Sequence, residues 1–262
     1  MKEAFFTGDR SFYKSLFAML IMVALQNIVA YSVNMADNLM LGSYSQGALS
    51  GAATVNQIFF MVQQITLFVG DSLIVLGAQY WGKKDTEPIR KLSGIVLRLA
   101  LICAIVIFIL CAVIPRPLML IFTTDEVIIR EGMRYLSIIK YTFVLFILSN
   151  VLMAILRSVE TVRISFYISI MSLIVNVGIN YVLIFGHFGF PELGIRGAAI
   201  GTLIARIMEF VIVVMYICKV DKKIELRKMK LLERNPQLKK DFTKMAIPIA
   251  LSQIFGGISV PM

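Results

Sequence analysis

Six long apolar runs limit what this chain can fold into. They lie at about residues 16–41, 50–78, 92–114, 136–156, 164–186 and 197–219, and a seventh opens near Met245. An α-helix needs about 20 apolar residues to cross the hydrocarbon core of a bilayer. The sequence therefore predicts an all-α, polytopic membrane protein, with a six-helix transmembrane bundle and a partial seventh helix.

The overall composition agrees with a membrane protein and excludes other classes. Hydrophobic residues make up 58% of the chain, charged residues 16%, and the mean hydropathy is +0.83, outside the usual range of water-soluble domains. The net charge of +10 comes from residues between the apolar runs and not from a basic face interleaved with aromatics. We therefore expect anionic membrane lipids, and no nucleic acid, as partners.

The distribution of Lys and Arg predicts the orientation. Nineteen of these residues lie in the N-terminal segment and alternate loops on one side, and four lie on the other. Basic residues resist translocation, so the N-terminus is predicted to be cytoplasmic in a bacterial plasma (inner) membrane. The first apolar run is too long for a cleaved signal peptide.

The polar stretch 219–244 divides the chain. We interpret residues 1–218 as an N-terminal six-helix lobe, 219–244 as a basic cytosolic linker, and 245–262 as the start of the first helix of a second lobe. "AIPIALSQ" (246–253) resembles "LIMVALQN" (20–27), as expected of a repeat. The partner expected for this lobe is a missing second lobe or a second copy.

Four polar residues within the apolar runs are candidates for an ion site. At about 1.5 Å of rise per residue, Asp37, Asn180 and Thr202 all lie roughly 6–10 Å below the outer ends of their helices. Asn176 lies one turn deeper than Asn180 on the same face. A carboxylate with amide and hydroxyl oxygens suits a small hard cation, and the carboxylate could instead bind a proton. Alternatively, the three uncharged residues only join helices by hydrogen bonds.

Other charged residues in the runs have more local interpretations. Arg206 and Glu209 are spaced to form an ion pair within one helix. Asp71 is expected to reach the inner interface or to line an inner vestibule. Arg98 can extend its guanidinium to the cytosolic surface. Lys140 lies near the level of Asp37, which raises the hypothesis that the two pair and that the lysine competes with a bound cation.

Several motifs together resemble the multidrug and toxic-compound extrusion (MATE) family, specifically its N-terminal lobe plus the start of helix 7. They are "ALQN" (24–27) in the first apolar run, "NMADNLMLG" (34–42), "AQYWGKKD" (78–85), "ILRSVE" (155–160), "NVGINYVLIFGHFGFPELGIRGAAIGTLIAR" (176–206) and "IPIALSQ" (247–253). The resemblance covers essentially the whole chain. No one motif is decisive, but their order and spacing are.

The resemblance implies a twelve-helix antiporter with two lobes and a central cavity, which exports organic cations in exchange for Na⁺ or H⁺ and needs no other cofactor. The first-lobe cation site of the family falls on Asp37, Asn176, Asn180 and Thr202. Many members carry aspartate where this chain has Asn180, and a helix 1 proline where it has Met22. We therefore expect one carboxylate at the site and predict no proline-induced bend in the first helix.

Three other functions are alternatives to an antiporter. A lipid-linked oligosaccharide flippase of the same superfamily would need a cavity rich in basic residues, and only Lys140 and Arg206 are deep enough to contribute. A membrane-embedded enzyme would need a nucleophile–base pair or a metal cluster, but the single histidine is in a loop, so we expect no enzyme. The third is a truncated, non-transporting membrane subunit.

Overall fold

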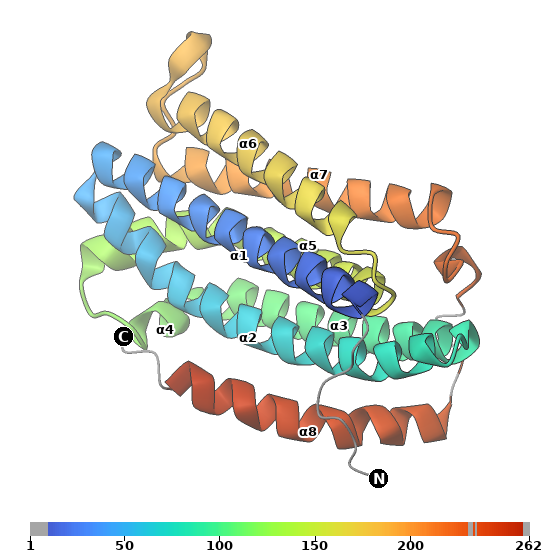
Figure 1. Cartoon of the computed structure of the whole chain (residues 1–262). Coiled ribbons are helices and arrows are strands. Elements are labelled where there is room, and N and C mark those ends of the chain that lie inside the picture. Colours follow the sequence, from blue (N-terminus) through green and yellow to red (C-terminus); the bar gives the residue numbers. More distant parts are fainter. Residues whose placement is uncertain (1–9, 230–232, 234, 259–262) are drawn as a thin grey trace.

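A computed structural model describes residues 10–229, 233 and 235–258, and within these the chain forms helices joined by short turns (Figure 1). The α-helices are α1 (Arg10–Tyr44), α2 (Gln46–Gly82), α3 (Thr86–Val113), α4 (Pro115–Leu120), α5 (Glu126–Ser158), α6 (Arg163–Phe185), α7 (Ile195–Lys219) and α8 (Pro236–Ile258). Two short 3₁₀ helices, η1 (His187–Gly189) and η2 (Leu226–Lys228), follow α6 and α7.

The prediction of six membrane-spanning helices is confirmed. Within the described residues, α1, α2, α3, α5, α6 and α7 are the 6 helices long and apolar enough to cross a membrane. The helices extend beyond the predicted apolar runs. For example, α5 begins at Glu126 rather than near residue 136, because Asp125 caps it by accepting a hydrogen bond from the Val127 N–H at 2.7 Å. Hydropathy detects only the apolar part of such a helix.

Helix α5 is the centre of the bundle. It packs against α2, α3, α4 and α7, while α6 packs against α1 and α7. The α2–α5 approach is close because both helices present glycine there: a Cβ on Gly51 would meet the backbone nitrogen of Gly132. Small residues at such crossings let membrane helices pack backbone to backbone.

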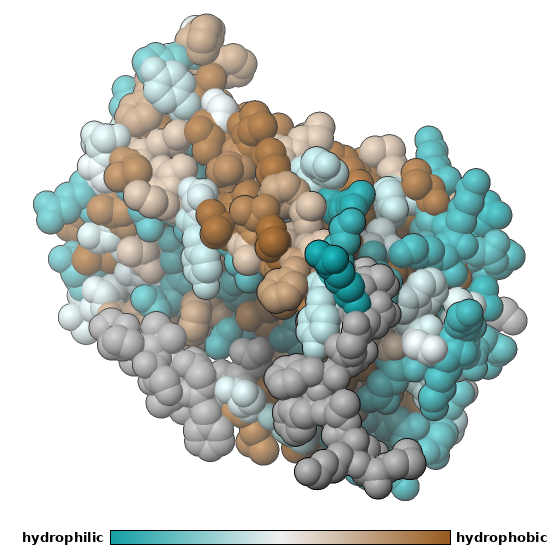
Figure 2. All heavy atoms as spheres, in the orientation of Figure 1, coloured by the Kyte–Doolittle hydropathy of each residue, from teal (hydrophilic) through white to brown (hydrophobic). Residues whose placement is uncertain are grey.

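Helix α1 is, by contrast, lightly packed. Among its side chains whose burial is described, only Asp37 and Leu41 are buried. Apolar residues such as Ile28 (59% exposed) and Met35 (65%) face outward, and Figure 2 shows hydrophobic surface over the middle of the bundle. The helix is continuous through Met22, with no break of the kind a proline produces.

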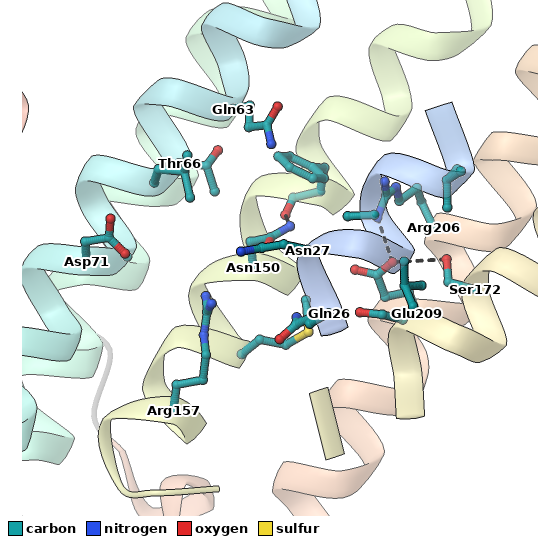
Figure 3. A pocket seen from close by; sticks show the side chains of 18 residues that line it. Gln26, Asn27, Gln63, Thr66, Asp71, Asn150, Arg157, Ser172, Arg206 and Glu209 are labelled. Carbon is teal, nitrogen blue, oxygen red and sulfur yellow. Dashed lines mark hydrogen bonds and ion pairs between the residues drawn. The ribbon is translucent and has the colours of Figure 1, made fainter. Parts of the chain in front are cut away.

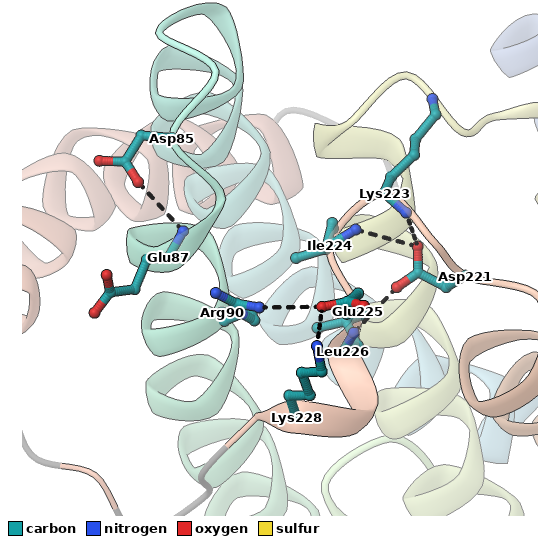
Figure 4. Close-up of polar contacts among 9 residues, drawn as sticks. All are labelled: Asp85, Glu87, Arg90, Asp221, Lys223, Ile224, Glu225, Leu226 and Lys228. Carbon is teal, nitrogen blue, oxygen red and sulfur yellow. Dashed lines mark hydrogen bonds and ion pairs between the residues drawn. The ribbon is translucent and has the colours of Figure 1, made fainter.

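The segment after α7 lies against the start of α3, and both are parts of the chain predicted to be cytoplasmic (Figure 4). Glu225, in the segment after α7, pairs with Arg90 of α3 at 3.8 Å and with Lys228. The hydrogen bond from Lys228 holds the pKa of Glu225 below its usual value. Lys223 donates to the Val159 carbonyl at 2.7 Å, which ties the same segment to the end of α5.

Helix α8 begins at Pro236, inside the stretch that we expected to be linker. Asn235 caps it by accepting a hydrogen bond from the Leu238 N–H at 3.0 Å, and the helix packs against α2 and α3. The repeat motif 246–253 lies within α8, and the expected second-lobe residues 259–262 lie outside the described part of the chain. The division into two lobes and a linker stays a prediction.

Candidate functional site

The four residues predicted as candidates for one ion site form a single hydrogen-bonded network, which we call the Asp37 network. The Asn180 amide donates to Asp37 Oδ1 at 2.6 Å and to Asn176 Oδ1 at 3.3 Å. The Asn176 amide donates in turn to Thr202 Oγ1 at 3.1 Å. Three helices, α1, α6 and α7, therefore bring their oxygen atoms together, as the depth estimate expected.

The pattern of α6 explains why its amides reach this point. The buried residues of α6 recur every three or four positions, which places them on one face of the helix. That face carries Ser165, Ser172, Asn176 and Asn180. A helix that buries such a polar stripe in a membrane must place it against polar partners on neighbouring helices, because lipid offers none.

The charge of the Asp37 network is not balanced locally. The carboxylate of Asp37 is only 8% exposed, and within the described part of the chain no Lys or Arg nitrogen lies within 4.0 Å of it. Arg206 acts on it electrostatically only from a greater distance. Asn180 Oδ1 is buried and has no hydrogen-bond partner among the residues that the structure describes. A carboxylate and an unpaired amide oxygen side by side can accept a small cation, and the carboxylate alone can accept a proton.

Two further residues shape the Asp37 network and were missed from the sequence. A Cβ on Gly201 of α7 would collide with Asn180 Oδ1, so only glycine allows α7 to lie this close to the amide. The Tyr135 side chain, 4% exposed, lies beside Thr202 and within the field of Asp37. Tyr135 directly precedes the predicted apolar run 136–156, so the hydropathy pattern placed it outside the membrane.

A second polar region, the inner cavity, lies between α1, α2, α5, α6 and α7 (Figure 3). Its volume is about 120 Å³. Arg206 and Glu209 on its α7 wall form an ion pair at 2.7 Å, which confirms the predicted pair. Ser172 donates to the same Glu209 carboxylate at 3.2 Å, and the Arg206 guanidinium lies 5.0 Å from the Phe146 ring centroid.

The other charged residues of the inner cavity are Asp71 of α2 and Arg157 of α5 (Figure 3). Asp71 thus lines an internal vestibule, one of the two positions expected for it. Arg157 was counted among the cytosolic loop residues and was not expected here. Its Nε is buried and has no hydrogen-bond partner in the described part of the chain, although the charge of Asp71 acts on the guanidinium. The cavity therefore contains two carboxylates and two guanidinium groups.

Lys140 belongs to neither region. Its ammonium lies 5.8 Å from the Phe108 ring centroid and 5.5 Å from that of Tyr141, and among the described residues it forms no ion pair with Asp37. The hypothesis of a Lys140–Asp37 pair is therefore wrong. The reason is rotational: Lys140 is on the side of α5 that faces α3, and Asp37 is on α1, where it contacts α6.

Comparison with known proteins gives a consistent result. The sequence model of the MatE family matches residues 23–182. The chain is 23% identical over 252 residues to the "Probable multidrug resistance protein YoeA" of Bacillus subtilis, covering 95% of this chain and 54% of that protein. It is 29% identical over 227 residues to the "Probable multidrug resistance protein NorM" of Bacillus cereus, covering 86% and 50%.

Solved structures share the fold. A MOP superfamily transporter from Pyrococcus furiosus superimposes with a TM-score of 0.81 at 18% identity, over 92% of this chain and 52% of that one. An outward-facing multidrug resistance MATE family transporter gives the same TM-score, identity and coverage. The chain thus spans about half the length of the relatives it matches.

Proposed function

Because the chain belongs to the MATE family, we propose that it forms the N-terminal lobe of a cation-coupled antiporter, which exports organic cations in exchange for Na⁺ or H⁺. The chain is a multi-pass membrane protein with six spanning helices. Two of its relatives carry the name of multidrug resistance proteins. The antiporter mechanism, the substrates and a cytoplasmic N-terminus are parts of this proposal.

One observation carries the coupling step: Asp37 is a buried carboxylate with no basic partner within 4.0 Å among the described residues. A charge in the membrane interior is costly unless it is paired or neutralised. An amide or a hydroxyl would connect the same helices without that cost. The carboxylate is therefore explained best by a ligand that binds reversibly, namely a sodium ion or a proton.

The exchange cycle follows from the position of this carboxylate. A cation that enters from the outer side binds between Asp37, the amide oxygens of Asn176 and Asn180, and Thr202. Binding replaces the 2.6 Å hydrogen bond from Asn180 to Asp37, so α1 and α6 are held differently with and without the ion. An ion that stabilises one arrangement of the helices shifts their population toward it. Release on the inner side reverses the shift, and the substrate moves in the opposite direction.

The alternatives receive less support. A flippase would be expected to present excess positive charge to a lipid-linked phosphate. In the inner cavity, however, Arg157 and Arg206 are matched in number by Asp71 and Glu209. The relatives are transporters, and the chain is not an enzyme.

The test is transport by the native gene product in liposomes loaded with a fluorescent organic cation. An imposed Na⁺ or pH gradient should drive its movement in the wild type, and Asp37→Asn should abolish the driven component. Lys140→Met serves as the matched control, because it removes a charge that lies outside both polar regions. This variant should transport normally. Full gradient-driven transport by Asp37→Asn, or none by the wild type with either gradient, would refute the proposal.

A further inference from the structure

A groove between α3 and α8 has basic side chains and apolar walls. Its volume is about 640 Å³. Arg98 and Lys239 supply the charge, Leu99, Ile102 and Phe242 supply apolar surface, and Thr243 lies on the α8 wall. The groove is separate from the Asp37 network and from the inner cavity, and nothing in the transport cycle uses it.

The positive charge of this groove is not neutralised. Arg98 Nε donates to the Gly94 carbonyl at 3.2 Å and Nη2 to the Glu233 carbonyl at 2.8 Å. These bonds fix the guanidinium and leave some of its five N–H donors for another partner. Among the described residues, neither Arg98 nor Lys239 forms an ion pair.

Two acidic residues of the adjoining segments, Glu233 and Asp241, have other partners. The Glu233 carboxylate pairs with Lys91 at 3.1 Å, and Asp241 accepts a hydrogen bond from Gln237 at 3.2 Å. Neither carboxylate lines the groove. The groove therefore attracts an anion, and the fixed guanidinium offers the planar set of donors that suits a phosphate.

An exposed apolar stripe continues from the groove along α3. Ile102 is 59% exposed, Ile105 46%, Val106 50% and Ile109 50%. Their spacing of three and four residues places them on one face of the helix, pointing away from the bundle. A free phosphate would leave this stripe unused, whereas an acyl chain would cover it.

The depth of the groove matches the level of a lipid headgroup. Helix α3 has 28 residues, which makes it about 42 Å long, compared with about 30 Å for the hydrocarbon core. If Val113 marks the outer boundary of the core, Arg98 lies about 8 Å inside the inner boundary, and its long side chain can extend toward that boundary. Lys239, the fourth residue of α8, lines the groove at the same end of the bundle.

We propose that this groove binds one anionic phospholipid of the inner leaflet. Arg98 and Lys239 hold its phosphate, and one acyl chain lies along the α3 stripe. Basic pockets between transmembrane helices on the cytoplasmic side are a recurring form of anionic-lipid site. The lipid would join α3 of the lobe to α8, and the site does not depend on whether Asp37 couples transport.

The test measures phospholipid retained by the native gene product in phosphatidylcholine nanodiscs supplied with phosphatidylglycerol, by native mass spectrometry. The double variant Arg98→Gln, Lys239→Gln should retain phosphatidylglycerol less well, on the order of tenfold. The matched control is Lys83→Gln, Lys84→Gln, which removes two exposed charges from the α2–α3 turn at the same end. The control should retain the lipid as the wild type does.

A second variant tests the groove in case the double variant loses lipid only because it misfolds. Thr243→Trp keeps both basic groups and fills the groove from the exposed wall of α8, so it should also lower retention. Equal losses in the double variant and its control would mean diffuse surface charge and overturn the site. Displacement of the lipid by millimolar inorganic phosphate would show a free-anion site instead. No retention of phosphatidylglycerol by the wild type would also overturn the site.

Discussion

The Asp37 network and the inner cavity are two polar regions of one bundle that differ in charge balance. The Asp37 network has one buried carboxylate surrounded by amides and a hydroxyl. The inner cavity has Arg157 and Arg206 beside Asp71 and Glu209. A balanced set of charges can persist in the membrane by itself. An unbalanced carboxylate needs a sodium ion or a proton, so the two regions should respond differently to mutation and to ions.

The largest expected effect is on stability and concerns the balanced region. Glu209→Ala would leave the partly buried Arg206 guanidinium without its 2.7 Å partner, which should cost about 3 kcal/mol of folding free energy. The double replacement Arg206→Met, Glu209→Met removes both charges and should recover most of this loss. Unfolding of the three proteins in the same detergent measures the difference. A double variant as unstable as Glu209→Ala would show that the pair is not balanced as described.

The second prediction restores charge to the unbalanced region. Asn180→Asp would place a second carboxylate beside Asp37 in place of the amide that donates to it at 2.6 Å. Because ligand charge tunes the affinity of oxygen sites, Na⁺ affinity should rise on the order of tenfold. Titration with Na⁺ at constant ionic strength measures it. Weaker or unchanged affinity would mean that Asn180 does not face the ion.

A smaller effect is expected from crowding the Asp37 network without changing its charge. Gly201→Ala would push a methyl group against Asn180 Oδ1 and rotate that amide, so ion affinity should fall by roughly three- to tenfold. Gly178→Ala is the matched control, because a Cβ there meets nothing within 4 Å. Equal behaviour of the two variants in the Na⁺ titration would argue against a role for the Asn180 amide.

The smallest effect is predicted for Lys140. Its ammonium lies over the Phe108 and Tyr141 rings rather than near Asp37, and such contacts contribute only about 0.5–1 kcal/mol. Lys140→Met should therefore leave Na⁺ affinity within about twofold of the wild type, since the change lies outside both polar regions. A clear rise in Na⁺ affinity would instead support the hypothesis that Lys140 competes with a bound cation.

The sequence predicted the six spans and the level of the Asp37 network because both depend on the axial coordinate alone. A fixed rise per residue converts position in the chain into depth, so Asp37, Asn180 and Thr202 could be placed at one level from three separate helices. Ion pairing of Arg206 with Glu209 was equally predictable, since it requires only neighbouring positions on one helix.

The direction in which a side chain points around the helix axis was not predictable in the same way. Lys140 and Tyr135 both lie on α5, yet only Tyr135 faces Thr202, a difference that the packing of α5 against α3 and α7 decides. Arg157 was assigned to a loop because it follows the apolar run, although α5 continues to Ser158. A hydropathy pattern does not show where a helix ends when its last residues are polar.

The most direct test of the account is ion binding by the native gene product, with Na⁺ binding and proton exchange measured in the same calorimetric titration. The wild type should bind Na⁺, or take up a proton as the pH falls, and Asp37→Asn should lose that event while retaining its fold. Asp71→Asn, which alters the inner cavity instead, should keep it. If Asp37→Asn binds ions like the wild type, the claim that this buried carboxylate is the coupling site is contradicted.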